Sequence, residues 1–248
     1  MDNIEQDYED FISTVSHELR TPLTSICGFS QTLLSSWDKL DDENKKKFIK
    51  IMEEQSQRLI HLVENMLAVT KLKSGSNLTV FSEFELKPLI SQVVTLVKNQ
   101  YQSQKFEINI EPNTPKIFAD KDKFMQVLVN LIENSAKYSP DNSTTEIDVK
   151  QDNKIIKINI SNTGIGIKEK DYDKIFTKFA RIDNPLTRKV QGSGLGLYIT
   201  KNLIEKMDGK IYVKSEPLNN SEDLSKITFT IEMPIKDIEE QTRIKCGR

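Results

Sequence analysis

Apolar residues in the first part of the chain recur at the spacing of an α-helix. From Phe11 to Leu33 they fall at helix-like intervals around Pro22, and from Phe48 to Val69 they alternate steps of four and three. The second pattern is a heptad seam. A polar loop over 35–42 separates the two runs. The pattern therefore predicts a helical hairpin, with a bend where Pro22 interrupts the hydrogen bonding of the first helix.

The apolar surface of the second run is wider than one neighbouring helix can cover. Ile51, Ile60, Val63 and Leu67 lie beside the heptad seam. Because an amphipathic helix buries its apolar face against other helices, a lone hairpin would leave these side chains in water. We therefore expect a homodimer whose two hairpins form a four-helix bundle. The alternative is that the hairpin packs on a second domain of its own chain.

Beyond residue 73 the pattern changes to a mixture of strands and helices. Strands are predicted at 79–85, 106–110, 146–150, 155–162, 211–214 and 227–233, and helices at 86–102, 120–138 and 193–207. The fold class expected is α+β, with the helical hairpin over 1–73, a linker at 74–77, a second domain at 78–236 and a tail at 237–248. The second domain should be an α/β sandwich with a mixed, mostly antiparallel sheet and helices on one face.

Composition and charge indicate which partners and which cellular compartment to expect. A formal net charge of -2 gives no general attraction to nucleic acid or to an anionic membrane. No run approaches the roughly 18 apolar residues of a membrane span, so we expect no direct membrane insertion by this segment. Cys27 and Cys246 show no metal-ligand spacing, which favours a reducing, cytoplasmic compartment.

A histidine with polar neighbours lies inside the first helical run, in the segment Ser-His17-Glu18-Leu-Arg-Thr21-Pro22-Leu. Neutral imidazole is a good nucleophile near neutral pH. Glu18 could accept the proton from one ring nitrogen. Thr21 lies four residues after His17, hence on the same helical face, where its hydroxyl could orient a water. These three are the candidate catalytic residues, although a lone histidine is as often an ordinary surface residue.

A second group of polar residues is followed by two glycine-rich segments. Asn130, Asn134 and Lys137 share one stripe of the predicted helix 120–138. The segments 160–167 and 191–197 each contain closely spaced glycines, which permit positive φ and close approach of the backbone to a ligand. Backbone N–H groups at the start of a helix bind phosphates. We interpret both segments as turns and the second, which opens a predicted helix, as a site for phosphates, although each turn taken alone is a weak signal.

Taken in order, these segments resemble the H-box, N-box, G1, F-box and G2 elements of the sensor histidine kinases of two-component signalling. The F-box counterpart is Ile175–Arg181, and the resemblance extends from Asp7 to Ile235. It implies ATP and Mg²⁺ as cofactors, a response regulator receiver domain as partner, and a homodimer. Many members are membrane receptors, so it also implies that the chain could be the cytosolic part of a membrane-anchored sensor.

The resemblance assigns roles residue by residue. Asn134 would help to bind Mg²⁺, whose other ligands are phosphate oxygens and waters. Asn130 and Lys137 would face the phosphates, Tyr138 the nucleotide edge and Arg181 the γ-phosphate. The full set of nucleotide-binding candidates is Asn130, Asn134, Lys137, Tyr138, Asn162, Gly164, Gly166, Ile167, Phe179, Arg181, Gly192, Ser193, Gly194, Leu195, Gly196 and Leu197.

The chain departs from the family pattern at a few positions. Asn162 stands where the family has an Asp that accepts a hydrogen bond from the adenine amino group. Losing the charge-assisted component costs about 1 kcal/mol, so we expect weaker ATP binding and a partial loss of adenine selectivity. The segment 219–226 has no glycine, which predicts an altered turn. Residues 183–191 are predicted to form a mobile polar lid.

Asn130 bears on the reaction type. In the related gyrase, Hsp90 and MutL ATPases a Glu at this place activates water, and an amide cannot act as a general base. Glu133 is turned by about 100° on the helix. We therefore expect a kinase that phosphorylates His17, passes the phosphoryl group to an aspartate of a response regulator, and also dephosphorylates that regulator. The alternatives are a degenerate kinase that acts as a scaffold or phosphatase with weak ATP binding, and a plain ATPase of the gyrase and Hsp90 type.

Overall fold

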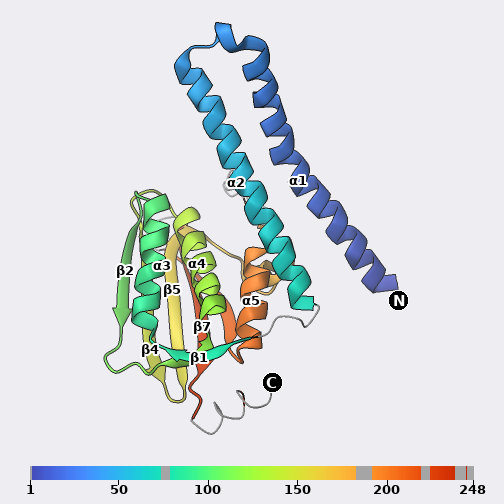
Figure 1. The fold of residues 1–248 in the computed structure, drawn as a ribbon. Helices are drawn as coiled ribbons and strands as arrows, with labels where there is room; N and C mark the ends of the chain where they lie inside the picture. Colours follow the sequence, from blue (N-terminus) through green and yellow to red (C-terminus); the bar gives the residue numbers. More distant parts are fainter. Residues whose placement is uncertain (1, 74–78, 183–191, 219–223, 238–243, 245–248) are drawn as a thin grey trace. The chain divides into compact units, whose positions relative to one another are not determined.

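The computed structural model describes residues 2–73, 79–182, 192–218, 224–237 and 244, with only the backbone of 2–11 and 73. The chain divides into two compact units, Met1–Ser74 and Gly75–Arg248, and each is described by itself (Figure 1). The predicted linker at 74–77 and most of the predicted tail lie outside the described residues. No helix in the described part of the chain combines the length and apolar character needed to cross a bilayer.

The first unit is the predicted helical hairpin. Helix α1 spans Asp2–Ser36, a 3-10 turn η1 spans Trp37–Lys39, and α2 spans Asp42–Lys73. Helix α1 is continuous through Pro22. The side chain of Asp41 starts α2, because its Oδ1 accepts a hydrogen bond from the backbone N–H of Asn44 at 2.7 Å.

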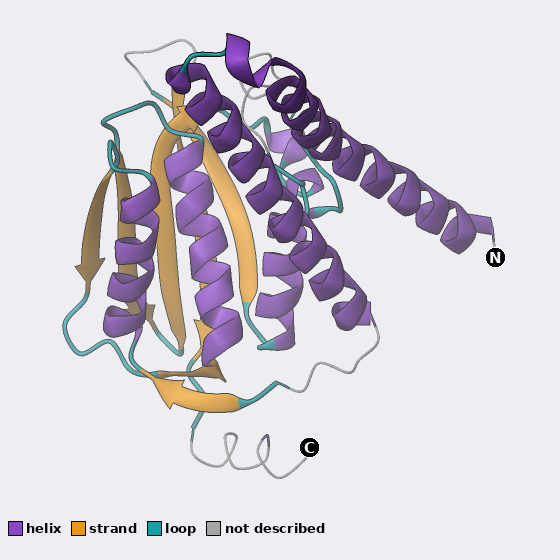
Figure 2. Cartoon of the chain, turned by 45° about the horizontal axis from the view of Figure 1, so that its top comes forward, coloured by secondary structure: helices purple, strands orange, loops and turns teal. Residues whose placement is uncertain are grey.

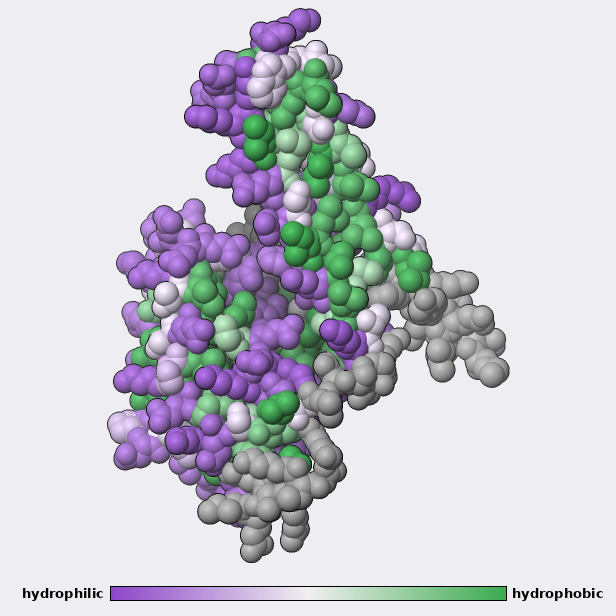
Figure 3. Space-filling model, viewed as in Figure 1, coloured by the Kyte–Doolittle hydropathy of each residue, from purple (hydrophilic) through white to green (hydrophobic). Residues whose placement is uncertain are grey.

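The hairpin leaves much of its apolar surface exposed. Phe29 and Phe48 pack across it with ring centroids 5.0 Å apart, and Leu33 and Leu62 are buried. Apolar side chains nevertheless gather along both helices in the space-filling view (Figure 3). The exposed ones are Ile12, Leu23, Leu34, Trp37, Ile49, Ile60, Val63 and Leu67. The two helices of the hairpin therefore do not cover these apolar side chains by themselves.

The second unit is a two-layer α/β sandwich, which confirms the predicted fold class. Within the described residues, a five-stranded sheet has the spatial order β2 (Lys105–Ile110), β4 (Thr144–Asp152), β5 (Ile155–Ile165), β7 (Leu224–Pro234) and β6 (Lys210–Pro217). Only β2 and β4 are parallel. Helices α3 (Leu86–Gln100), α4 (Lys121–Lys137) and α5 (Gly196–Lys206) cover one face (Figure 2). β1 (Phe81–Phe84) and β3 (Ile117–Asp120) form a separate antiparallel pair.

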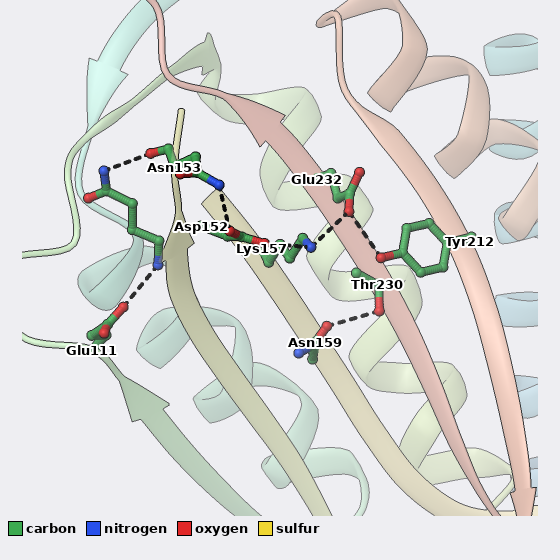
Figure 4. A network of polar contacts seen from close by, with 9 residues as sticks. Glu111, Asp152, Asn153, Lys157, Asn159, Tyr212, Thr230 and Glu232 are labelled. Carbon is green, nitrogen blue, oxygen red and sulfur yellow. Dashed lines mark hydrogen bonds and ion pairs between the residues drawn. The ribbon is translucent and has the colours of Figure 1, made fainter. Parts of the chain in front are cut away.

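The two faces of the sheet differ as the alternating pattern requires. On β5, Ile156, Ile158 and Ile160 are fully buried beneath the helices. The intervening side chains form a polar network on the open face (Figure 4). Its contacts include Lys157 Nζ to Asp152 Oδ2 at 2.8 Å, Thr230 Oγ1 to Asn159 Oδ1 at 2.9 Å and Tyr212 Oη to Glu232 Oε1 at 3.0 Å. A solvated sheet face of this kind is typical of antiparallel sheets.

Three local predictions were wrong. Strand β3 was missed because its four residues are all buried, so they show no alternation. Strand β5 continues to Ile165, through the first glycine-rich segment that was interpreted as a turn. Helix α5 begins at Gly196 rather than Ser193, since Gly194 has a φ of +67° that a helix cannot contain.

Candidate functional site

Helix α4 carries the Asn-rich stripe, and Asp120 fixes its start. The Asp120 carboxylate accepts hydrogen bonds from the backbone N–H groups of Lys123 at 3.1 Å and Val80 at 2.9 Å. Lys123 Nζ lies 3.2 Å from Oδ2. Burial acts to raise the pKa of Asp120, but these hydrogen bonds and the lysine charge outweigh burial and hold it below its ordinary value. The Asp120 carboxylate therefore links the start of α4 to Val80, which directly precedes β1.

Asn130 joins α4 to the start of α5. Its Nδ2 donates to Thr200 Oγ1 at 2.9 Å, and Thr200 is buried. A Cβ added to Gly196 would lie 2.2 Å from Asn130 Oδ1. Position 196 therefore requires glycine, because the Asn130 side chain occupies the space that a Cβ would fill. No pattern in the sequence pointed to Thr200, which lies 70 residues from Asn130 along the chain.

Asn134 is half-buried, and its side chain makes no hydrogen bond with a described residue. Its amide oxygen is therefore available to a ligand. Within the described residues there is no cluster of three or more His, Cys, Asp or Glu side chains that could hold a metal. An Mg²⁺ ion that takes most of its ligands from phosphates and water would fit a single amide oxygen of this kind.

Lys137, Tyr138, Gly192 and Arg181 come together at the end of α4. The space beside Gly192 is bordered by Lys137 Nζ and the Tyr138 hydroxyl, at 3.5 and 3.6 Å from an added Cβ. Lys137 Nζ lies 5.8 Å from the centre of the Tyr138 ring. Burial raises the pKa of the Tyr138 hydroxyl, and the charge of Arg181 partly offsets this rise. Lys137 and Tyr138 thus border the second glycine-rich segment, and the charge of Arg181 acts on the same tyrosine, an arrangement suited to phosphate oxygens.

The first glycine-rich segment approaches its protein neighbours closely instead of turning. Of the described glycines, only Gly194 has a positive φ. Gly164 pairs with Ser225 in the sheet, and a Cβ there would lie 2.7 Å from the carbonyl oxygen of Tyr138. At Gly166 a Cβ would lie 2.6 Å from Ser225 Oγ. The backbone N–H of Ile167 donates to Ser215 Oγ at 3.1 Å. The Gly164 contact brings the end of β5 against the end of α4, and the other two join it to β7 and β6.

Asn162 is the most deeply buried polar candidate, with 4% of its surface exposed. Its Nδ2 donates to Ser139 Oγ at 2.9 Å and to the carbonyl oxygen of Thr163 at 3.3 Å. Ser139 in turn donates to the carbonyl oxygen of Ser135 at 2.6 Å. Sequence reasoning identified Asn162 but missed Ser139, which directly follows the Tyr138 that it did identify.

The F-box segment contacts the second glycine-rich segment where Phe179 packs on Gly194, and both residues have a positive φ. Phe179 has a φ of +58°, which is unusual for a bulky residue, and it packs against Gly194. A Cβ on Gly194 would lie 2.7 Å from the carbonyl carbon of Phe179. Leu195 is fully buried, so its side chain belongs to the core and only its backbone could face a nucleotide. The half-buried Ser193 accepts a hydrogen bond from the Leu195 N–H at 3.3 Å, and Leu197 is half-buried at the start of α5.

The predicted lid at 183–191 lies outside the described residues, and so does most of the segment 219–226. Around them, the four candidate segments on α4, the end of β5, 175–181 and 192–197 converge through the glycine contacts above. Sequence proximity could not bring these segments together, because they are spread over some 70 positions of the second unit.

In the first unit, the candidate nucleophile is accessible. The His17 side chain is exposed on α1, and the Thr21 hydroxyl donates to the His17 carbonyl oxygen at 3.3 Å. The Glu18 carboxylate forms an ion pair with Arg58 of α2, with Nη2 and Oε2 3.2 Å apart. Arg58 was not identified from the sequence, since the pairing of the two helices alone brings it within reach of Glu18.

Two family models match this chain. The His Kinase A (phospho-acceptor) domain matches residues 7–75, and the Histidine kinase-, DNA gyrase B-, and HSP90-like ATPase matches residues 119–237. The first model contains His17, and the second contains all of the nucleotide-binding candidates. Residues 79–118, which form β1, α3, β2 and the start of β3, precede the second match.

Curated relatives align along nearly the whole chain. The sensor histidine kinase WalK of Bacillus subtilis is 31% identical over 245 residues, covering 96% of this chain and 38% of WalK. An uncharacterized sensor-like histidine kinase, ycf26 of Porphyra purpurea, is 36% identical over 231 residues, covering 85% of this chain and 34% of ycf26. The chain thus spans less than two fifths of the length of these relatives.

Solved structures share the fold. Acinetobacter baumannii histidine kinase AdeS superposes with a TM-score of 0.68 at 23% identity, covering 89% of this chain and 98% of AdeS. Histidine kinase ThkA, solved in complex with response regulator protein TrrA, gives a TM-score of 0.68 at 27% identity, covering 92% of this chain and 61% of ThkA.

Proposed function

This chain belongs to the sensor histidine kinase family, and from that membership we propose that it uses ATP to phosphorylate His17. The observation that carries the proposal is the pairing of two features. One is an exposed histidine in the phosphoacceptor unit. The other is the convergence of α4, β5 and the two segments at 175–181 and 192–197 in the ATPase-like unit.

In the proposed reaction an imidazole nitrogen of His17 attacks the γ-phosphorus of ATP. The bond between that phosphorus and the oxygen bridging to the β-phosphate breaks, and ADP leaves. Lys137 and Arg181 would offset the negative charge on the phosphates. The proton on the other ring nitrogen would pass to Glu18, the next residue of the helix, whose carboxylate forms an ion pair with Arg58.

Mg²⁺ belongs to this proposal as a phosphate-bound ion. Bound there, it would neutralise phosphate charge during transfer. Asn134 is the proposed protein ligand because its amide oxygen has no competing partner among the described residues. Asn130 supports the site by joining α4 to α5, so the two helices keep a fixed spacing around the phosphates.

We also propose that the phosphoryl group passes from His17 to an aspartate of a response regulator receiver domain. The complex of the related ThkA with TrrA supports a partner of this class. We further propose that the exposed Thr21 hydroxyl, one turn from His17, orients a water that hydrolyses the phosphoaspartate of the regulator and releases phosphate. Transfer is measured as movement of ³²P to a receiver domain, and it should stop when the receiver's acceptor Asp is changed to Asn.

The ATPase alternative receives less support. Asn130 has an amide that cannot take a proton, and this amide is held by Thr200. The nearest carboxylate along α4, Glu133, accepts a hydrogen bond from the Tyr101 hydroxyl at 3.3 Å. Burial and the Glu133 charge raise the pKa of Tyr101, so the phenol remains a donor to Glu133. Neither side chain is therefore placed to activate water.

The test is labelling with [γ-³²P]ATP of the wild type and of His17→Gln. We expect an acid-labile, alkali-stable label in the wild type that is lost in His17→Gln. His61→Gln is the matched control, because His61 is the other histidine of the chain and is exposed on α2. Label that persists in His17→Gln would refute the proposal. ATP binding without label would favour the scaffold, and steady phosphate release without a phosphoprotein would favour the ATPase.

A further inference from the structure

The buried side of the Asn162 amide is surrounded by hydrogen-bond acceptors. Its Nδ2 donates to Ser139 Oγ and to the carbonyl oxygen of Thr163. Its Oδ1 accepts no hydrogen bond from a described residue. Among the described residues, the only buried side-chain polar atom without a partner is the Thr145 hydroxyl, so Asn162 Oδ1 keeps contact with solvent. The amide thus points its NH₂ inward and leaves a carbonyl oxygen for a ligand.

Ser139 acts as an acceptor here because its own proton is used elsewhere. The Ser135 carbonyl belongs to the last turn of α4, where carbonyl groups lack a partner within the helix. Ser139 Oγ donates to this carbonyl at 2.6 Å. A backbone carbonyl can only accept, so it fixes the direction of the hydroxyl proton and leaves an Oγ lone pair toward Asn162.

A flipped amide would fit poorly against the same neighbours. Asn162 Oδ1 would then face the Thr163 carbonyl oxygen, and Ser139 would have to give up its bond to Ser135 in order to donate to Oδ1. The negative end of the α4 dipole also lies on this side and favours the NH₂ group. A purine amino group is a donor and matches an exposed Oδ1, whereas the corresponding carbonyl of guanine is an acceptor and does not.

We propose that Ser139 is a positioning residue that sets base selectivity by holding the Asn162 amide with its carbonyl oxygen toward the nucleotide. The inference rests on the proposed function, since it requires ATP to bind beside Asn162. The sequence alone predicted a partial loss of adenine selectivity, because Asn162 is neutral. Held in one orientation, the amide keeps its preference for an adenine amino group, whereas an amide that can flip loses it.

The experiment measures dissociation constants for ATP–Mg²⁺ and GTP–Mg²⁺ by isothermal titration calorimetry on the full chain. The wild type should prefer ATP. Ser139→Ala should lower the ratio of ATP to GTP affinity about tenfold, because roughly one hydrogen bond then ceases to discriminate between the two amide orientations. Ser139→Thr keeps the hydroxyl and should restore the wild-type ratio.

Ser143→Ala is the matched control. Ser143 lies four residues along and bonds to Gln104 Oε1 at 2.9 Å and to the Pro140 carbonyl at 2.7 Å, so its loss should leave the ratio unchanged. The decisive comparison repeats Ser139→Ala in a protein that also carries Asn162→Asp. Both oxygens of a carboxylate accept hydrogen bonds, so the Asp side chain has no amide orientation for Ser139 to fix. Ser139→Ala should therefore change the ratio in the Asn162 background but not in the Asp background.

A general loss of packing would weaken ATP and GTP together and leave their ratio constant, and that result would overturn the proposal. An equal change of the ratio in both backgrounds, or a wild type that prefers GTP, would also overturn it. If the wild type binds neither nucleotide, the proposed function itself fails. If it binds ATP and Ser139→Ala keeps the wild-type ratio, only the role of Ser139 is refuted.

Discussion

Single glycines hold the candidate site together, each for a different reason. Gly164 makes room for the carbonyl of Tyr138, Gly196 makes room for the side chain of Asn130, and Gly194 combines a left-handed backbone with close packing on Phe179. Gly192 has looser surroundings, because the nearest atom to an added Cβ is the flexible Lys137 Nζ at 3.5 Å. The glycines of the candidate site are therefore not equivalent.

Gly194→Ala should be far more damaging than Gly192→Ala. The added methyl of Gly194→Ala would meet backbone atoms at 2.7 Å and occupy a φ of +67°, so we expect a loss of about 1–3 kcal/mol in the free energy of unfolding. Gly192→Ala meets no such contact and should change it by less than about 0.5 kcal/mol. Urea unfolding without nucleotide measures both. Equal losses would contradict this account of the strain.

At the scale of elements, α4 determines where most of the site lies. Its start is capped by Asp120, its middle contacts α5 through Asn130, and its end contacts β5 through Ser139 and Tyr138. Asp120 also accepts from Val80 at the entry to β1. One buried carboxylate therefore anchors both the helix and the edge of the unit.

Asp120→Asn should destabilise the second unit in a pH-dependent way. The folded-state pKa of Asp120 lies below its ordinary value of 3.8, so its stabilisation is fully present above that value and is lost as pH falls through the folded pKa. We expect a loss of about 1 kcal/mol at pH 7 that shrinks toward zero below about pH 4. Chemical denaturation at several pH values measures this difference.

Asp122→Asn is the control for that prediction. Asp122 lies in the same first turn of α4 but is exposed, so its substitution should change the free energy of unfolding by less than about 0.5 kcal/mol. A loss at Asp120 that stays constant from pH 7 to pH 3 would show that the carboxylate charge is not what anchors the helix.

At the scale of the whole molecule, the uncovered hairpin is the main feature. Ile60, Val63 and Leu67 are 49%, 45% and 53% exposed, and their spacing places them on one stripe of α2. Burying such side chains contributes about 1.5–3 kcal/mol each. We propose that a second copy of the chain covers this stripe in a four-helix bundle.

Ile60→Glu combined with Leu67→Glu should therefore raise the dimer dissociation constant at least about 100-fold, because each change replaces buried apolar area with a charge. Sedimentation velocity measures this shift. The control is Gln57→Glu combined with His61→Glu, which adds the same charges at exposed positions of α2 that are not among the three stripe residues. A dimer that survives the first pair unchanged would exclude this face as the interface.

The sequence by itself determined the hairpin, the order of most strands and helices, and the candidate residues. Hydrophobic periodicity and local spacing depend on neighbours along the chain, so they can be read without a structure. The all-buried strand β3 and the passage of β5 through Gly164 could not be read in this way, because strand pairing and not local pattern produced them.

Only the tertiary structure decided which groups face one another. The Glu18–Arg58, Asn130–Thr200 and Asn162–Ser139 contacts join residues 40, 70 and 23 positions apart. Hydrogen bonds are short and directional, so a partner is set by how helices and strands pack, which no spacing in the sequence encodes. For the same reason, the sequence identified the amide at position 162, while packing decided which of its ends a nucleotide would meet.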